Sequence, residues 1–160
     1  MFTDIVSSTE RAAALGDGPW KALLAEYDVI SKREIASFGG RYVTSTGDGL
    51  LALFDGPARA TNCATAIVSD VHDIGLEIRA GVHTGEVEHA GSDIRGLAVH
   101  IGARVAALAG PSEVLVSRTV KDLTAGSGLV FEDAGEHDLK GVPDRWRLYR
   151  VVEQGAPLPS

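Results

Sequence analysis

Two short runs of β-forming residues, separated by Gly47-Asp48-Gly49, constrain most strongly how this chain can fold. Residues 41–46 and 50–54 are rich in β-branched, aromatic and aliphatic side chains, and a Gly-Asp-Gly triplet between such runs is typical of a β-hairpin turn. The pattern predicts a hairpin with Asp48 at its tip. Because the flanking glycines add no side-chain bulk, the Asp48 carboxylate is expected to point outward.

A second carboxylate, Asp4, has a similar setting near the start of the chain. Residues 2–5 have the pattern of a short buried strand, and the segment Ser7-Ser-Thr-Glu10 has the Ser/Thr-before-Glu signature of a helix start. If the two strands are neighbours in one sheet, Asp4 and Asp48 converge beside that helix N-terminus. Paired carboxylates bind hard divalent cations and helix-start N–H groups bind phosphate, so the arrangement predicts a metal–nucleotide site.

The composition describes one globular domain. The chain has 160 residues, of which 44% are hydrophobic, enough for a substantial core. No apolar run approaches the roughly 20 residues that span a bilayer, and no signal peptide precedes the first strand, so we expect no membrane contact in this segment. The net charge of −7 argues against a nucleic-acid surface. The lone Cys63 falls in an apolar helical pattern, and a buried free thiol fits a cytoplasmic location.

The order of periodic segments predicts an α+β fold. The leading order of strand, helix, hairpin, helix, strand is a ferredoxin-like βαββαβ core with additional C-terminal strands and a helix. Beyond the hairpin and the first strand, helices are expected over 7–14, 19–38, 58–71, 97–108 and 117–124, and strands over 76–83, 87–89, 114–116, 129–132 and 145–152. We assign residues 1–152 to one domain, excised from a longer chain because Asp4 follows only three residues, and 153–160 to a disordered tail.

Six short motifs follow one another along the chain. They are Phe2-Thr-Asp-Ile5, Thr46-Gly-Asp-Gly49, Ala80-Gly-Val-His-Thr-Gly85, Asp93-Ile-Arg-Gly96, Ala103-Arg104 and Gly135-Glu-His-Asp-Leu-Lys-Gly141. In this order and spacing they resemble the catalytic domain of the class III nucleotide cyclases, the adenylyl/guanylyl cyclase family, especially its actinobacterial, mycobacterial-like members. A lone Thr-Gly-Asp-Gly would be a weak signal, whereas six blocks in sequence are specific. The resemblance implies conversion of ATP to 3′,5′-cyclic AMP and pyrophosphate in intracellular signal transduction.

The resemblance also implies roles for particular residues. Asp4, Asp48 and the Ile5 carbonyl match the family's ligands for two Mg²⁺ or Mn²⁺ ions, which promote attack by the ribose 3′-hydroxyl and neutralise the triphosphate. Arg104 matches the arginine that contacts the phosphates in the transition state. Asp93 matches the residue that accepts a hydrogen bond from the adenine 6-amino group. The alternative interpretations, taken one residue at a time, are a solvated turn residue for Asp4 or Asp48, a helix-surface arginine for Arg104 and a helix cap for Asp93.

Phosphate binding has further candidates. Ser7, Ser8 and Thr9 supply the backbone N–H groups of the predicted helix start, which can bind phosphate. Lys140, within Leu-Lys-Gly, is a candidate for the terminal phosphates, although the phosphate lysine of the family also aligns two residues later, with Val142.

Two positions depart from the family pattern. Thr44 stands where the family usually has a lysine that contacts the purine, and a short neutral side chain gives at best a weak or water-mediated contact. His100 stands where the family usually has an asparagine that orients the ribose. It can donate one hydrogen bond, but its protonation varies near neutral pH. We therefore expect a slower, less base-selective enzyme in which Asp93 still favours ATP.

The family's active site is shared between two subunits, so a chain that carries both halves implies a head-to-tail homodimer with composite sites. A competing hypothesis is a catalytically weak cyclase-like module that binds nucleotide or dimerises to regulate attached domains, and Thr44 and His100 support it. A diguanylate cyclase is disfavoured because its Gly-Gly-Asp/Glu-Glu-Phe hairpin is missing from the sequence. His72, His89 and His137 lack zinc-like spacing with Cys63, and His83 is interpreted as structural.

Overall fold

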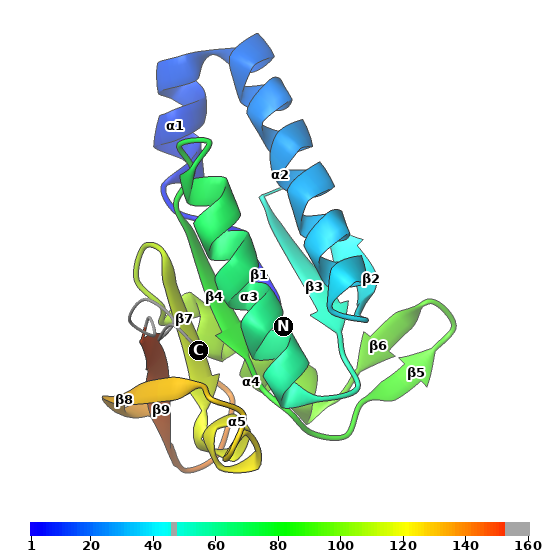
Figure 1. Cartoon of the computed structure of the whole chain (residues 1–160), viewed down its shortest axis with the longest axis vertical. Helices are drawn as coiled ribbons and strands as arrows, with labels where there is room; N and C mark the ends of the chain where they lie inside the picture. The colour runs from blue at the N-terminus through cyan, green and yellow to red at the C-terminus, as the bar shows by residue number, and fades with distance from the viewer. Residues whose placement is uncertain (46–47, 153–160) are drawn as a thin grey trace, which may run out of the picture.

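A computed structural model describes residues 1–45 and 48–152. The elements in chain order are β1 (Phe2–Ile5), α1 (Ser8–Leu15), α2 (Asp17–Ser37), β2 (Arg41–Ser45), β3 (Gly49–Leu53), α3 (Pro57–His72), β4 (Ile78–Val82), β5 (Glu88–Ala90), β6 (Asp93–Arg95), α4 (Leu97–Ala107), β7 (Glu113–Ser117), α5 (Arg118–Leu123), β8 (Val130–Asp138) and β9 (Arg145–Val152). Among these residues a seven-stranded sheet has the order β2-β3-β1-β4-β7-β9-β8, and β5 and β6 form a separate two-stranded arm (Figure 1).

The first four strands of the large sheet form the expected core. β1 lies between β3 and β4 and is antiparallel to both, with Asp4 opposite Gly49 on one side and opposite Arg79 on the other. Helices α1 and α2 connect β1 to β2, and α3 connects β3 to β4. This order of strands and crossovers is the ferredoxin-like βαββαβ arrangement, so the predicted fold class is confirmed.

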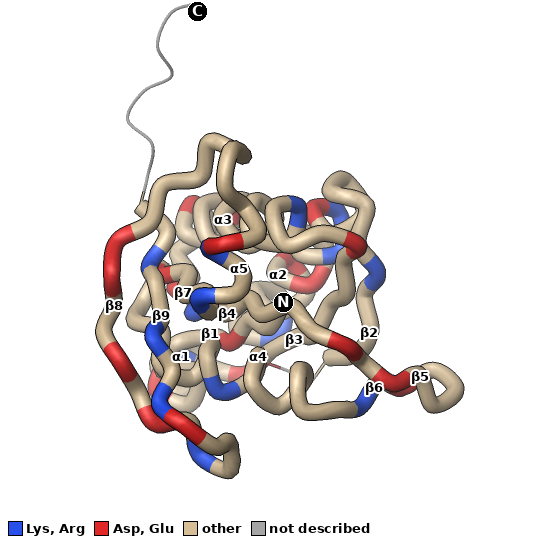
Figure 2. Tube along the Cα trace, turned by 90° about the horizontal axis from the view of Figure 1, so that it is seen from below, with Lys and Arg blue, Asp and Glu red and all other residues tan. Residues whose placement is uncertain are grey.

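The two faces of the sheet are covered by different helices. Ile5, Ala80 and Val82 belong to the larger core, which α2 and α3 cover on one face. Phe2 and Gly81 point to the other face, where α4 packs, because successive residues of a strand alternate between faces. Figure 2 shows the resulting layers, with α2 and α3 on one side of the strands and α4 on the other.

Gly81 permits the close packing of α4 on the sheet. A Cβ built at this position would lie 2.3 Å from the backbone nitrogen of Ala106. The fit therefore needs glycine at this point of β4, and it fixes the depth at which α4 lies over β1 and β4.

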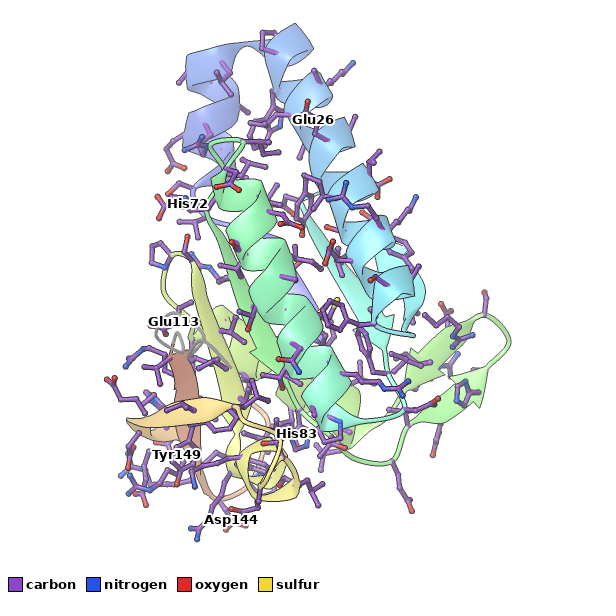
Figure 3. The ribbon with its side chains drawn as sticks, in the orientation of Figure 1. Glu26, His72, His83, Glu113, Asp144 and Tyr149 are labelled. Carbon is purple, nitrogen blue, oxygen red and sulfur yellow. The ribbon has the colours of Figure 1, made fainter. Side chains whose placement is uncertain are left out.

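The additional C-terminal strands carry a ladder of ion pairs. Arg147 of β9 reaches Asp133 and Glu136 of β8 at 2.6 and 3.3 Å. Arg150 reaches Glu113 of β7 and Glu132 of β8 at 2.7 and 2.8 Å. Figure 2 shows the acidic β8 beside the basic β9, and Glu113 and Tyr149 are labelled on this part of the sheet in Figure 3. These ion pairs link β9 to β8 and to β7.

Some sequence predictions were wrong in detail. No strand was expected between residues 90 and 96, but Asp93–Arg95 form β6, which pairs with β5 from Asp93 opposite Ala90 to Arg95 opposite Glu88. The strand expected over 129–132 extends to Asp138 as β8, because its irregular, mostly polar second half pairs with β9. The tail assigned to 153–160 and the first half of the Thr46-Gly-Asp-Gly49 motif lie outside the described residues. Within the described part of the chain, none of the helices combines the length and apolar character needed to cross a bilayer.

Candidate active site

Of the two predicted metal-binding carboxylates, Asp4 lies on β1 and Asp48 directly precedes the neighbouring strand β3. The Ile5 N–H donates a 2.8 Å hydrogen bond to the backbone carbonyl of Asp48, directly after the pairing of Asp4 with Gly49. Both aspartates are half-buried, and the N–H and C=O of one strand residue point the same way, so the Ile5 carbonyl also faces the turn that carries Asp48. The sequence prediction that Asp4 and Asp48 converge agrees with this geometry.

The electrostatics of Asp4 reflect this convergence. Burial, and secondly the nearby Asp48 carboxylate, raise the pKa of Asp4 above its ordinary value, while Arg79 opposes the shift. Two carboxylates near each other favour binding of a cation, because the cation removes their mutual repulsion. A hard, oxygen-preferring divalent ion such as Mg²⁺ or Mn²⁺ fits this donor set of two carboxylates and a backbone carbonyl.

Arg79 is a neighbour of the site that the sequence analysis missed. It lies directly opposite Asp4 on β4, and its Nε atom is buried without a hydrogen-bond partner among the described residues. The sequence does contain a signal for it: Arg79 is a charged residue among the mostly apolar residues of the strand that leads to Gly81. Its charge lowers the local negative potential beside Asp4.

The start of α1 completes this first group. Ser8 donates its hydroxyl to Asp48 Oδ2 at 2.9 Å, which places the helix N-terminus beside the carboxylate pair. The expected capping box does not form, since the N-cap Ser7 has a left-handed backbone with φ of 54° and no side-chain cap bond. The Ser8 hydroxyl is used on Asp48 instead. The exposed Ser7 and Thr9 flank it at the first turn, where helical N–H groups lack intrahelical partners.

A second group lies on α4 and the loop that follows β8. His100 and Arg104 are one helical turn apart and therefore share a face of α4. His100 Nε2 lies 2.8 Å from the Lys140 carbonyl. Since a carbonyl only accepts, His100 uses its Nε2–H on this contact. The side chain of Lys140 is exposed, whereas Val142 packs partly buried against the second core cluster.

Thr44 and Asp93 occupy separate places. Thr44 lines a hollow of about 330 Å³ together with Asp4 of β1 and Ala103 of α4. Asp93 is exposed at the first residue of β6, in the arm. It does not cap α4, whose N-cap residue is Gly96 and has no side-chain cap bond.

The predicted residues thus form two groups in one chain. Among the described residues, no hydrogen bond or ion pair joins the group around Asp4 and Asp48 to the group of His100, Arg104 and Lys140. The first group is built on β1, the start of β3 and α1, and the second on α4 and the turn that follows β8. In this single chain, the groups are held by different elements.

The histidines and cysteine have structural settings. His83 Nδ1 lies 2.7 Å from the buried Ser117 hydroxyl and its ring packs edge-on to Trp146. In Figure 3 His83 lies below α3, close to the end of β4. Burial lowers the pKa of His83 to about 4. Cys63 is fully buried. Within the described residues there is no cluster of three or more His, Cys, Asp or Glu side chains that could hold a metal.

Solved structures with the same arrangement are nucleotide cyclases. An adenylate cyclase from Trypanosoma brucei, studied in its monomeric state, superposes with a TM-score of 0.83 at 20% identity over 94% of this chain and 85% of that one. The fold is that of the class III cyclase catalytic domains. The guanylate cyclase domain of RhGC from Catenaria anguillulae, solved with GTP, superposes with a TM-score of 0.80 at 19% identity over 94% of this chain and 93% of that one. At these identities the likeness is one of fold.

Curated relatives support the same class III cyclase relationship. The adenylate cyclase of Streptomyces coelicolor is 28% identical over 117 residues, 72% of this chain and 31% of the relative. The pH-sensitive adenylate cyclase of Mycobacterium tuberculosis is 26% identical over 181 aligned positions, 94% of this chain and 46% of the relative. The chain spans 16 to 33% of the length of the relatives that reach 29% identity from Rhizobium meliloti and M. tuberculosis. No family model matches the chain. The resemblance predicted from the motifs is confirmed.

Proposed function

We propose that this domain converts ATP to 3′,5′-cyclic AMP and pyrophosphate. The observation that carries the proposal is the meeting of Asp4 and Asp48 beside the N-terminus of α1, with Ser8 bonded to Asp48. Carboxylates at this point suit two divalent ions, and the first turn of α1 suits a phosphate chain. The same geometry fits a magnesium- or manganese-dependent phosphoryl reaction better than any metal-free chemistry of the histidines.

In the proposed mechanism the protein positions and stabilises charge. Asp4, Asp48 and the Ile5 carbonyl would hold the two divalent ions, which supply activation of the ribose 3′-hydroxyl and charge neutralisation on the triphosphate. The α1 N–H groups near Ser8 orient the phosphates for in-line attack on the α-phosphorus. Arg104 donates to the phosphate oxygens as negative charge moves toward the departing pyrophosphate.

The proposal requires two copies of the chain. Asp4 and Asp48 form one half-site, and His100, Arg104 and Lys140 form the other, on α4 and the turn after β8 of the same chain. A head-to-tail homodimer would bring the first half of each subunit against the second half of its partner.

Selectivity for ATP is proposed from Asp93. An exposed carboxylate on the arm can accept a hydrogen bond from the adenine amino group, whereas the short Thr44 adds little discrimination. We expect ATP turnover to exceed GTP turnover, and Asp93→Asn to reduce this preference.

The direct test is production of cyclic AMP from Mn²⁺-ATP by the purified domain across a range of protein concentrations. Activity per subunit should rise with concentration as dimers form, and Asp4→Ala should abolish it. Asp55→Ala is the matched control, because Asp55 is an exposed aspartate just beyond β3 that is not paired with Asp4. Equal loss in both variants, or activity independent of concentration, contradicts the proposal. Faster turnover of GTP contradicts the adenine preference alone.

Complementation tests the shared site. Asp4→Ala and Arg104→Ala should each be inactive alone, while their mixture should recover up to about a quarter of wild-type activity if subunits exchange at random. Recovery is expected because one of the two composite sites in the mixed dimer is intact. If folded, exchanging variants give no recovery, the site is not shared.

A second candidate function is a cyclase-like module that binds nucleotide with little turnover. It is favoured by one observation: His100 already donates its Nε2–H to the Lys140 carbonyl, so this N–H is not available to the nucleotide. In this case Mn²⁺-ATP would bind and raise the melting temperature without cyclic AMP forming.

A further inference from the structure

The contact between His100 and the backbone after β8 gives His100 a function different from that of the asparagine it replaces. Its Nε2 atom lies 2.8 Å from the Lys140 carbonyl. Because this oxygen can only accept, Nε2 carries the proton, and in the neutral ring Nδ1 is left as an acceptor. A neutral His100 held in this way has no second N–H to offer to a ribose oxygen.

The segment held by His100 is a tight turn that packs on α4. Val142 N–H donates to the Leu139 carbonyl at 2.9 Å, and Gly141 has a φ of +80°. Leu139 is 3% exposed and lies in the same core cluster as Ile101 of α4. A Cβ at Gly141 would lie 3.0 Å from His100 Nε2, so the imidazole fits closely against the turn.

The turn leaves one cation available for phosphate. Lys140 is exposed, and among the described residues no acidic side chain forms an ion pair with it. Val142 is apolar and partly buried, so position 142 cannot supply a charge here. Arg104 lies one helical turn after His100, which puts both the arginine and the anchored turn on the same side of α4.

We propose that His100 is a positioning residue that donates Nε2–H to the Lys140 carbonyl, holds the turn 139–142 on α4, and thereby presents Lys140 beside Arg104 for the terminal phosphates of the nucleotide. The inference rests on the proposed cyclase function. In this role His100 acts on phosphate binding through Lys140, whereas the asparagine usual in the family contacts the ribose directly. The donor is present in both the neutral and the protonated ring, so the anchor does not depend on protonation of His100.

Two substitutions separate the two nitrogen atoms of the imidazole. A glutamine amide nitrogen reaches about as far from the backbone as Nε2, whereas an asparagine amide reaches only about as far as Nδ1. His100→Gln should keep the contact with Lys140, and His100→Asn should lose it while restoring the residue usual in the family. We expect His100→Asn to raise the KM for Mn²⁺-ATP about tenfold with little change in kcat, because phosphate binding is weakened. His100→Gln should keep KM within about threefold.

A double-mutant cycle tests the link to Lys140. Lys140→Met alone should also raise KM about tenfold, and His100→Asn in the Lys140→Met background should add little, because the lysine being positioned is gone. Additive effects, near a hundredfold, overturn the proposal. It is also overturned if His100→Asn lowers KM or raises kcat while His100→Gln is impaired, since that pattern belongs to a direct contact on the Nδ1 side.

Hydrogen exchange gives a readout that needs no turnover. The Val142 amide should exchange about tenfold faster in His100→Asn than in the wild type and stay protected in His100→Gln, because the anchored turn closes over this amide. Equal exchange in all three proteins overturns the anchor itself. Faster exchange without cyclic AMP production by any of them would support the anchor and overturn both the proposed function and the catalytic role of the contact.

Discussion

Gly81→Ala is the substitution that best tests how α4 is placed. The new Cβ would lie 2.3 Å from the Ala106 nitrogen and 2.6 Å from its Cα, where ordinary contacts begin at 3.4 Å. Backbone atoms cannot rotate away as a flexible side chain can, so α4 must move by the difference, about 1 Å. Overpacking of this kind costs about 1–3 kcal/mol. For a domain of this size, each kcal/mol lowers the melting temperature by about 2–4 °C.

The assay is thermal unfolding followed by circular dichroism, together with cyclic AMP production. Because α4 carries Arg104 and His100, a shift of about 1 Å is expected to reduce turnover about a hundredfold if these residues act as proposed. Gly18→Ala is the matched control, since a Cβ there meets nothing within 4 Å, and it should leave stability unchanged or raise it by up to about 1 kcal/mol. If Gly81→Ala has the same melting temperature as the wild type, the packing argument is refuted.

Three further outcomes are expected. Asp4→Asn should raise the stability of the metal-free protein by up to about 1 kcal/mol at pH 7, because the raised pKa of Asp4 means that its charged form opposes folding. Added Mn²⁺ should raise the melting temperature of the wild type but not that of the variant. Since burial lowers the pKa of His83 from 6.5 to about 4, stability should fall as pH decreases between these values, and His83→Gln should flatten that part of a melting-temperature profile. Tyr27→Phe leaves the buried Thr3 hydroxyl without its partner and should cost about 1–3 kcal/mol in urea unfolding, whereas Tyr42→Phe should cost less.

Local signals in the sequence were sufficient for much of the fold. The Gly-Asp-Gly turn, the helical spacing of α2 and α3, and the apolar run of β4 each specify an element without tertiary information. β6 was missed because three residues in a polar stretch have no period of their own and become a strand only by pairing with β5. The polar half of β8 was missed for the same reason, since its arginine partners lie on β9.

The candidate site shows the same division. The convergence of Asp4 and Asp48 could be predicted because each lies at a strand end in a recognisable motif. The Ser8 bond to Asp48 in place of a helix cap, and the contact of His100 with Lys140, could not, because both depend on residues about 40 positions apart in sequence. Contacts of this kind are set by packing of the whole sheet, which local sequence propensity does not report.

The central position of β1 has a consequence for how the domain matures. Its two neighbours, β3 and β4, follow it by some 45 and 75 residues, so β1 has neither neighbour in the sheet until synthesis has passed β3. The acidic pair is therefore assembled late. Incomplete translation products would expose Asp4 without its counterpart, and a partly folded molecule would lack the carboxylate pair that we propose as the ion site.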